Sequence, residues 1–178
     1  MTTADLPTAG ELLATYDDDS WPAPRVLVLG LGNPLLGDDG AGLALLALVE
    51  AAGPWPMNVR LVDGGTWGMS LLPDVLDAER LLVLDAVRTG REPGAVVRGE
   101  DDAVPRWYAR PASPHQVDLH EVLAAAQLLG GMPERLVVVG IEPASTDVLH
   151  LGLAPEVEDA LAVAGREAVR VLADLAEG

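Results

Sequence analysis

The chain has 178 residues, which fits one domain of ordinary size. Hydrophobic residues make up 49% of it and charged residues 22%, so it can bury a sizeable core and is not a disordered chain. Its 28 acidic residues against 11 basic ones give a net charge of −17. This excess excludes a nucleic-acid partner and an anionic membrane surface, because no basic patch of useful size can form. The absence of Cys excludes disulfides, thiolate metal sites and a Cys nucleophile.

The first residues and the apolar stretches argue against export and membrane insertion. Residues Met1–Gly10 lack a basic segment followed by an apolar one, so we expect no secretory signal. The longest apolar stretches, such as Ala41–Val49, fall well short of the roughly 18 residues of a membrane span. We therefore expect a cytoplasmic protein. Residues 1–24, with several prolines and an acidic run, predict a loosely ordered extension, followed by one domain over residues 25–178.

From Arg25 onward, short apolar runs typical of buried strands alternate with segments typical of helices. In chain order the pattern predicts strand 25–30, helix 41–52, strand 58–63, a helix over 68–78 that is interrupted or kinked near Pro73, strand 80–85, a short strand 95–98, a loop, a helix that opens at Pro114, strand 135–140 and helix 155–176. This alternation predicts an α/β fold. We expect a single-domain three-layer sandwich, with a mainly parallel twisted sheet and helices on both faces.

Carboxylates follow three of the predicted strands. Asp38 and Asp39 come after the first strand, Asp63 ends the second, before Gly64, Gly65 and Thr66, and Asp85 ends the third. Because the carboxyl ends of parallel strands meet at one edge of a sheet, we expect these side chains to lie close together. His115 is a plausible further member, since Ser113, Pro114 and Gln116 have the form of a capping box that puts it in the first turn of a helix.

Each of these residues also has a purely structural interpretation. Asp39 could cap the following helix, and Asp63 could be an ordinary turn residue. His115 could be a simple first-turn residue. Asp85 is harder to explain in this way, because a charge at the end of an apolar run is costly unless it is satisfied.

The group as a whole favours a metal site. Two carboxylates about 4 Å apart repel each other by about 4 kcal/mol at an effective dielectric constant near 20, so a cation or a shared proton is expected between them. The helix dipole disfavours a charged imidazole at His115 and keeps it available as a ligand. Two carboxylates and one imidazole suit a divalent transition metal with open positions, and Asp118 is a candidate partner for the imidazole.

A dinucleotide site at the first loop is disfavoured. The segment Gly30–Leu35 follows a strand, but Leu35 occupies the position of the third glycine and Pro34 interrupts the loop. Asp38 and Asp39 would repel a pyrophosphate at the helix N-terminus.

Five segments in the same order make the chain resemble the hydrogenase maturation endopeptidases, over residues 25–176. They are Val28–Gly40 (VLGLGNPLLGDDG), Leu61–Met69 (LVDGGTWGM), Leu84–Ala86 (LDA), Ser113–Gln116 (SPHQ) and His150–Pro155 (HLGLAP). The resemblance implies a phosphorylase/hydrolase-like fold. It also implies an endopeptidase that removes the C-terminal peptide from the large-subunit precursor of a nickel–iron hydrogenase after nickel insertion.

By motif, the metal-binding trio of that family corresponds to Asp39, Asp85 and His115, and the first acid is Glu in some members and Asp in others. The resemblance implies that these side chains recognise nickel already held by substrate cysteines; zinc or cadmium could occupy the site in vitro. His150 is a candidate proton donor for the leaving amine, although its neighbourhood could equally serve packing or substrate docking. Two alternatives stay open: another aspartate-dependent hydrolase on the same fold, and a non-catalytic metal-checking or chaperone-like module.

Overall fold

The computed structural model describes residues 21–101, 104 and 114–177, with the backbone alone for residues 114–118. Within these ranges the expected alternation of strands and helices is confirmed. The elements are β1 (Val26–Leu31), η1 (Gly37–Gly40), α2 (Ala41–Ala51), β2 (Val59–Gly65), η2 (Gly68–Leu71), α3 (Leu72–Asp77), β3 (Arg80–Ala86), β4 (Val96–Glu100), α5 (Pro114–Leu129), β5 (Arg135–Ile141) and α6 (Pro155–Glu177).

One five-stranded sheet, in the order β2-β1-β3-β5-β4, forms the middle layer. The pairs β1–β2, β1–β3 and β3–β5 are parallel, and only the edge strand β4 runs antiparallel to its neighbour β5. The three inner strands are buried along almost their whole length. A sheet buried on both faces explains why these segments read as continuous apolar runs rather than as alternating ones.

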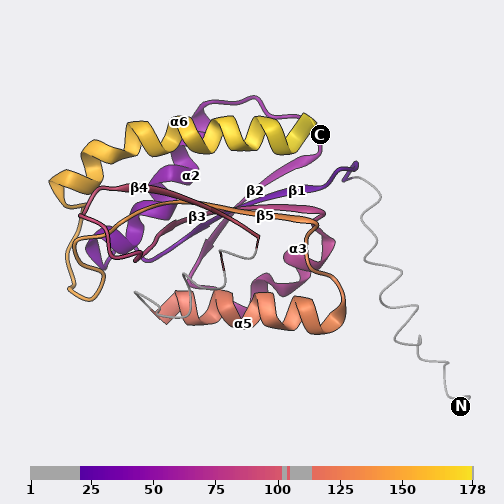
Figure 1. Ribbon diagram of the computed structural model, residues 1–178, viewed down its shortest axis with the longest axis horizontal. Helices are drawn as coiled ribbons and strands as arrows, with labels where there is room; N and C mark the ends of the chain where they lie inside the picture. Colours follow the sequence, from indigo (N-terminus) through magenta and orange to yellow (C-terminus); the bar gives the residue numbers. More distant parts are fainter. Residues whose placement is uncertain (1–20, 102–103, 105–113, 178) are drawn as a thin grey trace, which may run out of the picture.

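Helices cover both faces of the sheet (Figure 1), which confirms the three-layer arrangement. On one face α2 and α6 pack through a cluster that contains Val28, Leu45 and Leu172. On the other face η2, α3 and α5 pack through a cluster that contains Leu29, Val75 and Val122. The connections at the carboxyl ends of the strands lie together at the left of Figure 1.

One local prediction is confirmed and one differs from the structure. The helical segment is interrupted near Pro73, since it is divided into the 3-10 helix η2 and α3, and Pro73 lies in the first turn of α3. Proline is tolerated there because the first-turn amide has no partner within the helix. The second strand extends beyond Asp63 to Gly65, with a register shift opposite Gly30 and Leu31.

Residues 21–24 contact the domain although the sequence assigns them to the extension. The Trp21 side chain is buried in the core, its indole N–H donates to the Asn58 carbonyl oxygen at 2.8 Å, and the Arg60 guanidinium stacks 4.1 Å from its ring centroid. The Asn58 side-chain amide donates in turn to the Pro24 carbonyl oxygen. The rest of the predicted extension, residues 1–20, lies outside the described residues. A helix that is both long enough and apolar enough to cross a bilayer is absent from the described ranges.

Candidate functional site

Asp39 and Asp85, two of the three predicted ligands, are buried at the carboxyl end of the sheet. Asp39 lies in η1, where its Oδ2 accepts a hydrogen bond from the Asn33 backbone N–H at 2.9 Å. Asp85 follows Leu84 in β3, and its Oδ1 accepts from the Ala86 N–H at 2.7 Å. Both side chains are almost completely buried. The simple capping interpretation of Asp39 is wrong, because Gly40 is the N-cap residue of α2.

Gly42 explains how η1 comes to lie against the end of β3. A Cβ at this position would lie only 2.3 Å from the carbonyl oxygens of both Leu31 and Leu84, and 2.9 Å from the Asp85 Cα. Only a glycine lets the first turn of α2 approach the ends of β1 and β3 so closely. Because η1 continues directly into α2 and contacts β3, Asp39 and Asp85 are brought to the same edge.

Asp38 is also buried, but it holds the protein's own backbone. Its Oδ2 accepts hydrogen bonds from the N–H groups of Ala144 at 2.8 Å and Ser145 at 3.2 Å, and its Oδ1 accepts from the N–H of Ala154 at 2.6 Å. These three donors lie at the two ends of the loop between β5 and α6. Asp38 therefore fixes this loop against η1, a role that the sequence pattern did not indicate.

The segment that follows β2 lies at the same edge but is more exposed. Asp63 and Thr66 are exposed, whereas Gly64 is buried. A Cβ at Gly64 would lie 2.8 Å from Leu31 Cδ2, and Gly65 has a φ of +41°, a conformation that favours glycine. The two glycines thus allow a tight turn beside β1, and the Asp63 carboxylate stays accessible to a bound molecule.

The third predicted ligand, His115, and its predicted partner, Asp118, lie in α5, but their side chains are outside the described residues. The described part of α5 begins at Pro114, and Ser113, the predicted N-cap residue, lies outside the described residues. Among the side chains of residues 21–101, 104 and 119–177, no three His, Asp or Glu residues gather in an arrangement that could bind a metal. The trio of Asp39, Asp85 and His115 accordingly stays a prediction.

His150 is exposed and its backbone is bound to the first loop. Its N–H donates to the Leu35 carbonyl oxygen at 3.0 Å, and its carbonyl oxygen accepts from the Gly37 N–H at 2.9 Å. Residues 36 and 150 consequently pair as in a parallel sheet. The imidazole stays in solvent beside the segment that carries Asp38 and Asp39.

Glu142 is a buried acid that sequence reasoning missed. It follows β5, and its carboxylate accepts hydrogen bonds from the Thr89 hydroxyl and N–H, both at 2.7 Å, and from the Gly90 N–H at 3.1 Å. Burial by itself raises the pKa of Glu142, but hydrogen bonds from Thr89, Gly90 and Arg91 outweigh burial and lower the pKa below its usual value of 4.5. A charged residue directly after the apolar run 136–141 was the available signal.

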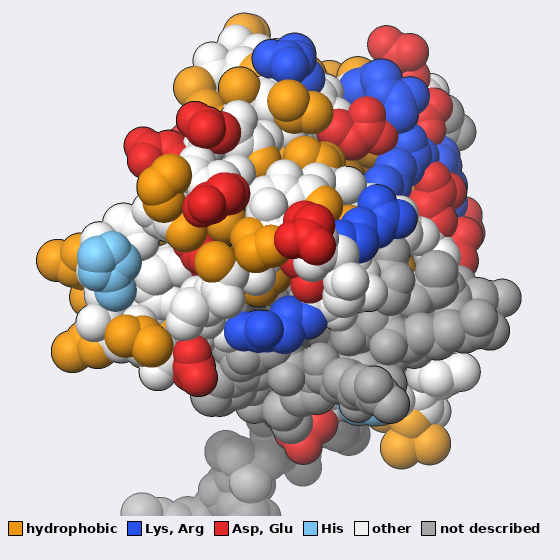
Figure 2. Space-filling model, turned by 60° about the vertical axis from the view of Figure 1, so that its left-hand side comes forward, with side chains coloured by type: hydrophobic (Ala, Val, Ile, Leu, Met, Phe, Trp, Pro, Cys, Tyr) orange, Lys and Arg blue, Asp and Glu red, His pale blue; other side chains and the backbone are white. Residues whose placement is uncertain are grey.

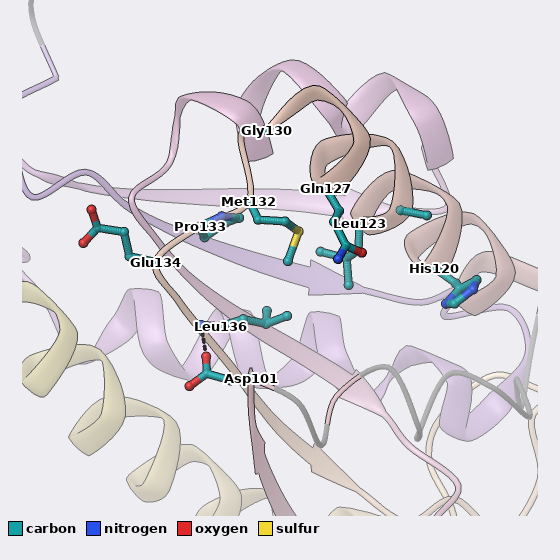
Figure 3. Close-up of a pocket in the computed structure, with 10 residues that line it drawn as sticks. Asp101, His120, Leu123, Gln127, Gly130, Met132, Pro133, Glu134 and Leu136 are labelled. Atoms are coloured by element: carbon teal, nitrogen blue, oxygen red, sulfur yellow. Dashed lines mark hydrogen bonds between the residues drawn. The ribbon is translucent and has the colours of Figure 1, made fainter.

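A pocket of about 480 Å³ lies at the opposite end of the sheet (Figure 3). It is lined by α5 residues, including His120 and Leu123, and by the segment that leads into β5, including Met132. The Asp101 carboxylate beside it accepts from the Leu136 N–H at 3.0 Å. Leu136 is near the start of β5, so this pocket lies at the amino ends of the strands. Open α/β sheets bind ligands at the other edge, which leaves the carboxyl end as the candidate site.

Comparisons with known proteins point to one family. A family model for hydrogenase maturation proteases matches residues 44–171. The chain is 42% identical to the hydrogenase expression/formation protein HupD of Rhodobacter capsulatus over 149 residues, which cover 83% of this chain and 71% of that protein. It is 38% identical to the hydrogenase 2 maturation protease of Escherichia coli over 135 residues, which cover 75% of this chain and 82% of that protein.

Solved structures agree with the sequence comparisons. The chain matches the hydrogenase maturating endopeptidase HybD from Escherichia coli with a TM-score of 0.79 and 36% identity, over 84% of this chain and 93% of that chain. It matches a nickel–iron hydrogenase maturation protease, HybD from Thermococcus kodakarensis, with a TM-score of 0.63 and 28% identity, over 86% of this chain and 99% of that chain.

Proposed function

Since this chain belongs to the hydrogenase maturation protease family, we propose that it removes the C-terminal peptide from the large-subunit precursor of a nickel–iron hydrogenase after nickel has been inserted. The observation that supports this proposal is the pair of buried carboxylates, Asp39 and Asp85, at the carboxyl end of the sheet. Buried carboxylates are retained when they are paired, hydrogen-bonded or bound to a cation. In this proposal the cation is the nickel of the substrate.

Asp39, Asp85 and His115 complete the coordination of nickel that the precursor already holds through its cysteines. This sharing of the nickel ligands between precursor and protease suits the chain, because the chain has no Cys of its own to bind a metal tightly. Carboxylate and imidazole ligands leave positions open for ligands from the substrate. Zinc or cadmium would occupy the same ligands in vitro.

The coordination also places the scissile peptide bond. A water molecule adds to its carbonyl carbon, the carbon–nitrogen bond breaks, and the products are a new C-terminal carboxylate on the large subunit and a free amine on the released peptide. The exposed Asp63 and the Gly64–Thr66 turn line the approach to this edge, so they are candidates for contacts with the bound segment. His150 is the candidate donor of the proton to the leaving amine.

The test is to incubate the purified protein with the precursor, with and without nickel, and to measure the mass of the precursor. We expect nickel-dependent loss of the C-terminal peptide by the natural protein and none by the Asp85→Asn and His115→Ala variants. Full cleavage by both variants would overturn the assigned site. Cleavage without nickel would indicate a different aspartate-dependent hydrolase, and binding without cleavage would indicate a metal-checking module.

A further inference from the structure

An exposed apolar surface lies next to the candidate site, and it is formed by two loops that are bonded to each other. We refer to Leu35, Val148, Leu149 and Leu151 as the apolar rim. Their exposures are 51%, 60%, 79% and 74%. Leu35 precedes η1, and the other three lie in the loop between β5 and α6. Figure 2, in which the side with the carboxyl ends of the strands is turned toward the viewer, shows hydrophobic side chains that protrude at its left edge.

The rim is held in place rather than loosely attached. Backbone hydrogen bonds join His150, between two of its leucines, to Leu35 and Gly37. The Asp38 carboxylate binds the two ends of the same loop through Ala144, Ser145 and Ala154. A surface that is already ordered loses little conformational entropy when a partner covers it. Exposed leucines that the fold fixes in this way are typical of a binding surface.

A small pocket continues the rim toward the candidate site. Its volume is about 290 Å³, and its lining includes Asp38, Val148 and His150. Its lining includes Val148 of the rim, so it can receive a side chain of a segment that is docked on the rim. Four side chains supply only a fraction of the roughly 800 Å² that each partner of a stable interface buries, so the rim alone would not hold a second copy of the chain, whereas a substrate that is also held at the candidate site needs only a supplementary contact.

We propose that the apolar rim docks an apolar segment of the hydrogenase large-subunit precursor next to the peptide bond that is cut. This inference rests on the proposed function, which requires a polypeptide to lie across the carboxyl end of the sheet. Asp38, which fixes the rim, is the neighbour of Asp39, which is proposed to contact the substrate nickel. The rim therefore adds affinity for the protein part of the substrate, at a position continuous with the contacts to the metal.

The test compares two double variants of equal chemistry, with the nickel-loaded precursor as the probe. The rim variant, Leu149→Ser/Leu151→Ser, removes the two most exposed leucines of the rim. The control variant, Leu128→Ser/Leu129→Ser, removes two leucines at the end of α5, which lies at the other end of the sheet; their side chains are 87% and 64% exposed. Binding of the precursor is measured by biolayer interferometry, and cleavage by mass spectrometry over a range of precursor concentrations. Unchanged thermal unfolding of both variants shows that they are folded.

We expect the rim variant to bind the precursor about 10- to 100-fold more weakly, which corresponds to about 1.4–2.8 kcal/mol of binding free energy, because a docked segment would cover the two exposed leucines only in part. KM should rise while kcat is retained, because a docking contact holds substrate and transition state equally. The control variant should match the natural protein.

Equal binding by the rim and control variants overturns the proposal and leaves the proposed function intact. If the natural protein binds the precursor without cleaving it, the proposed function alone is overturned. The ratio of the Kd values of the rim and control variants then still tests whether the rim docks the precursor. An absence of binding overturns both.

Discussion

The Asp38 carboxylate accepts a hydrogen bond from the backbone N–H of Ala154 at 2.6 Å, although 116 positions separate the two residues in the chain. This bond, with those from Ala144 and Ser145, ties the start of α6 and the end of β5 to the loop that also carries Asp39. The arrangement of the candidate site therefore depends on Asp38, although the carboxylate of Asp38 itself is hydrogen-bonded to backbone N–H groups of the protein.

Replacement of Asp38 by Asn should loosen the loop between β5 and α6. The amide has one oxygen where the carboxylate has two, so an N–H of Ala154 or of the Ala144–Ser145 pair loses its acceptor. An unsatisfied buried donor costs about 1–3 kcal/mol, and we expect a loss of this size in the free energy of unfolding, measured by urea denaturation. Hydrogen exchange at residues 144, 145 and 154 should become faster.

Asp147→Asn is the matched control for Asp38→Asn, because Asp147 lies in the same loop but is exposed. Within the described residues, its carboxylate accepts one hydrogen bond, from the Ser145 hydroxyl. It should leave the stability within about 0.5 kcal/mol, as exposed substitutions usually do. Equal exchange rates in both variants would contradict the assigned role of Asp38.

Gly42→Ala should disturb the contact between α2 and the ends of β1 and β3. The added methyl group would lie 2.3 Å from two backbone carbonyl oxygens, and a backbone cannot move aside as a flexible side chain can. Overpacking costs about 1–3 kcal/mol and occasionally more, so we expect a clear fall in Tm together with a loss of cleavage.

Gly165→Ala in α6 provides the comparison for Gly42→Ala. Its Cβ would meet Leu48 Cδ1, the end of a flexible side chain, at 3.0 Å. Because alanine is favoured over glycine in a helix by about 1 kcal/mol, the free energy of unfolding should change by no more than about that amount. If the two alanine variants had equal stability, the argument from close approach at Gly42 would be wrong.

Glu142→Gln should remove a pH-dependent part of the stability. The folded-state pKa of Glu142 lies below its ordinary value of 4.5, so its stabilising contribution is fully present above pH 4.5 and is lost as the pH falls through the folded-state pKa. At pH 7 we expect the variant to be less stable by about 1–3 kcal/mol, because donors that bound a carboxylate now face an amide.

The check on Glu142 is urea denaturation at a series of pH values from 7 downward, through pH 4.5 and into the more acidic range in which the folded-state carboxylate becomes protonated. The difference in the free energy of unfolding between the natural protein and the Glu142→Gln variant should become smaller as the pH falls. Glu121→Gln, at an exposed position of α5, is the control for removal of one negative charge. If the difference in the free energy of unfolding stayed constant with pH, the charge of Glu142 would not be the cause of the stabilisation.

Asp39→Glu should keep cleavage of the nickel-loaded precursor, whereas Asp39→Ala should abolish it. Glutamate would retain a carboxylate at the position that is proposed to contact the substrate nickel. Loss of an outer partner of a metal ligand already costs about 10–100-fold, so we expect removal of the ligand itself to lower kcat/KM by more than about 100-fold. Single-turnover cleavage followed by mass spectrometry measures both variants. Equal activity of the glutamate and alanine variants would exclude Asp39 as a ligand.

The sequence was sufficient to predict the layered α/β fold. Strands such as β3 and β5 are apolar throughout because they are buried on both faces, and this composition is visible without a structure. The order of strands and helices, with carboxylates at or after the ends of three predicted strands, was sufficient to predict that Asp39 and Asp85 lie at one edge.

The tertiary structure decided what the other acids do. The partners of Asp38 lie 106 to 116 positions away, and those of Glu142 lie 51 to 53 positions away. Apolar periodicity reports which face of an element is buried, whereas loop backbone donors have no periodicity and depend on how distant loops meet. For that reason the sequence by itself determined the fold and the edge that carries the site, and only the folded chain decided which carboxylates hold its loops.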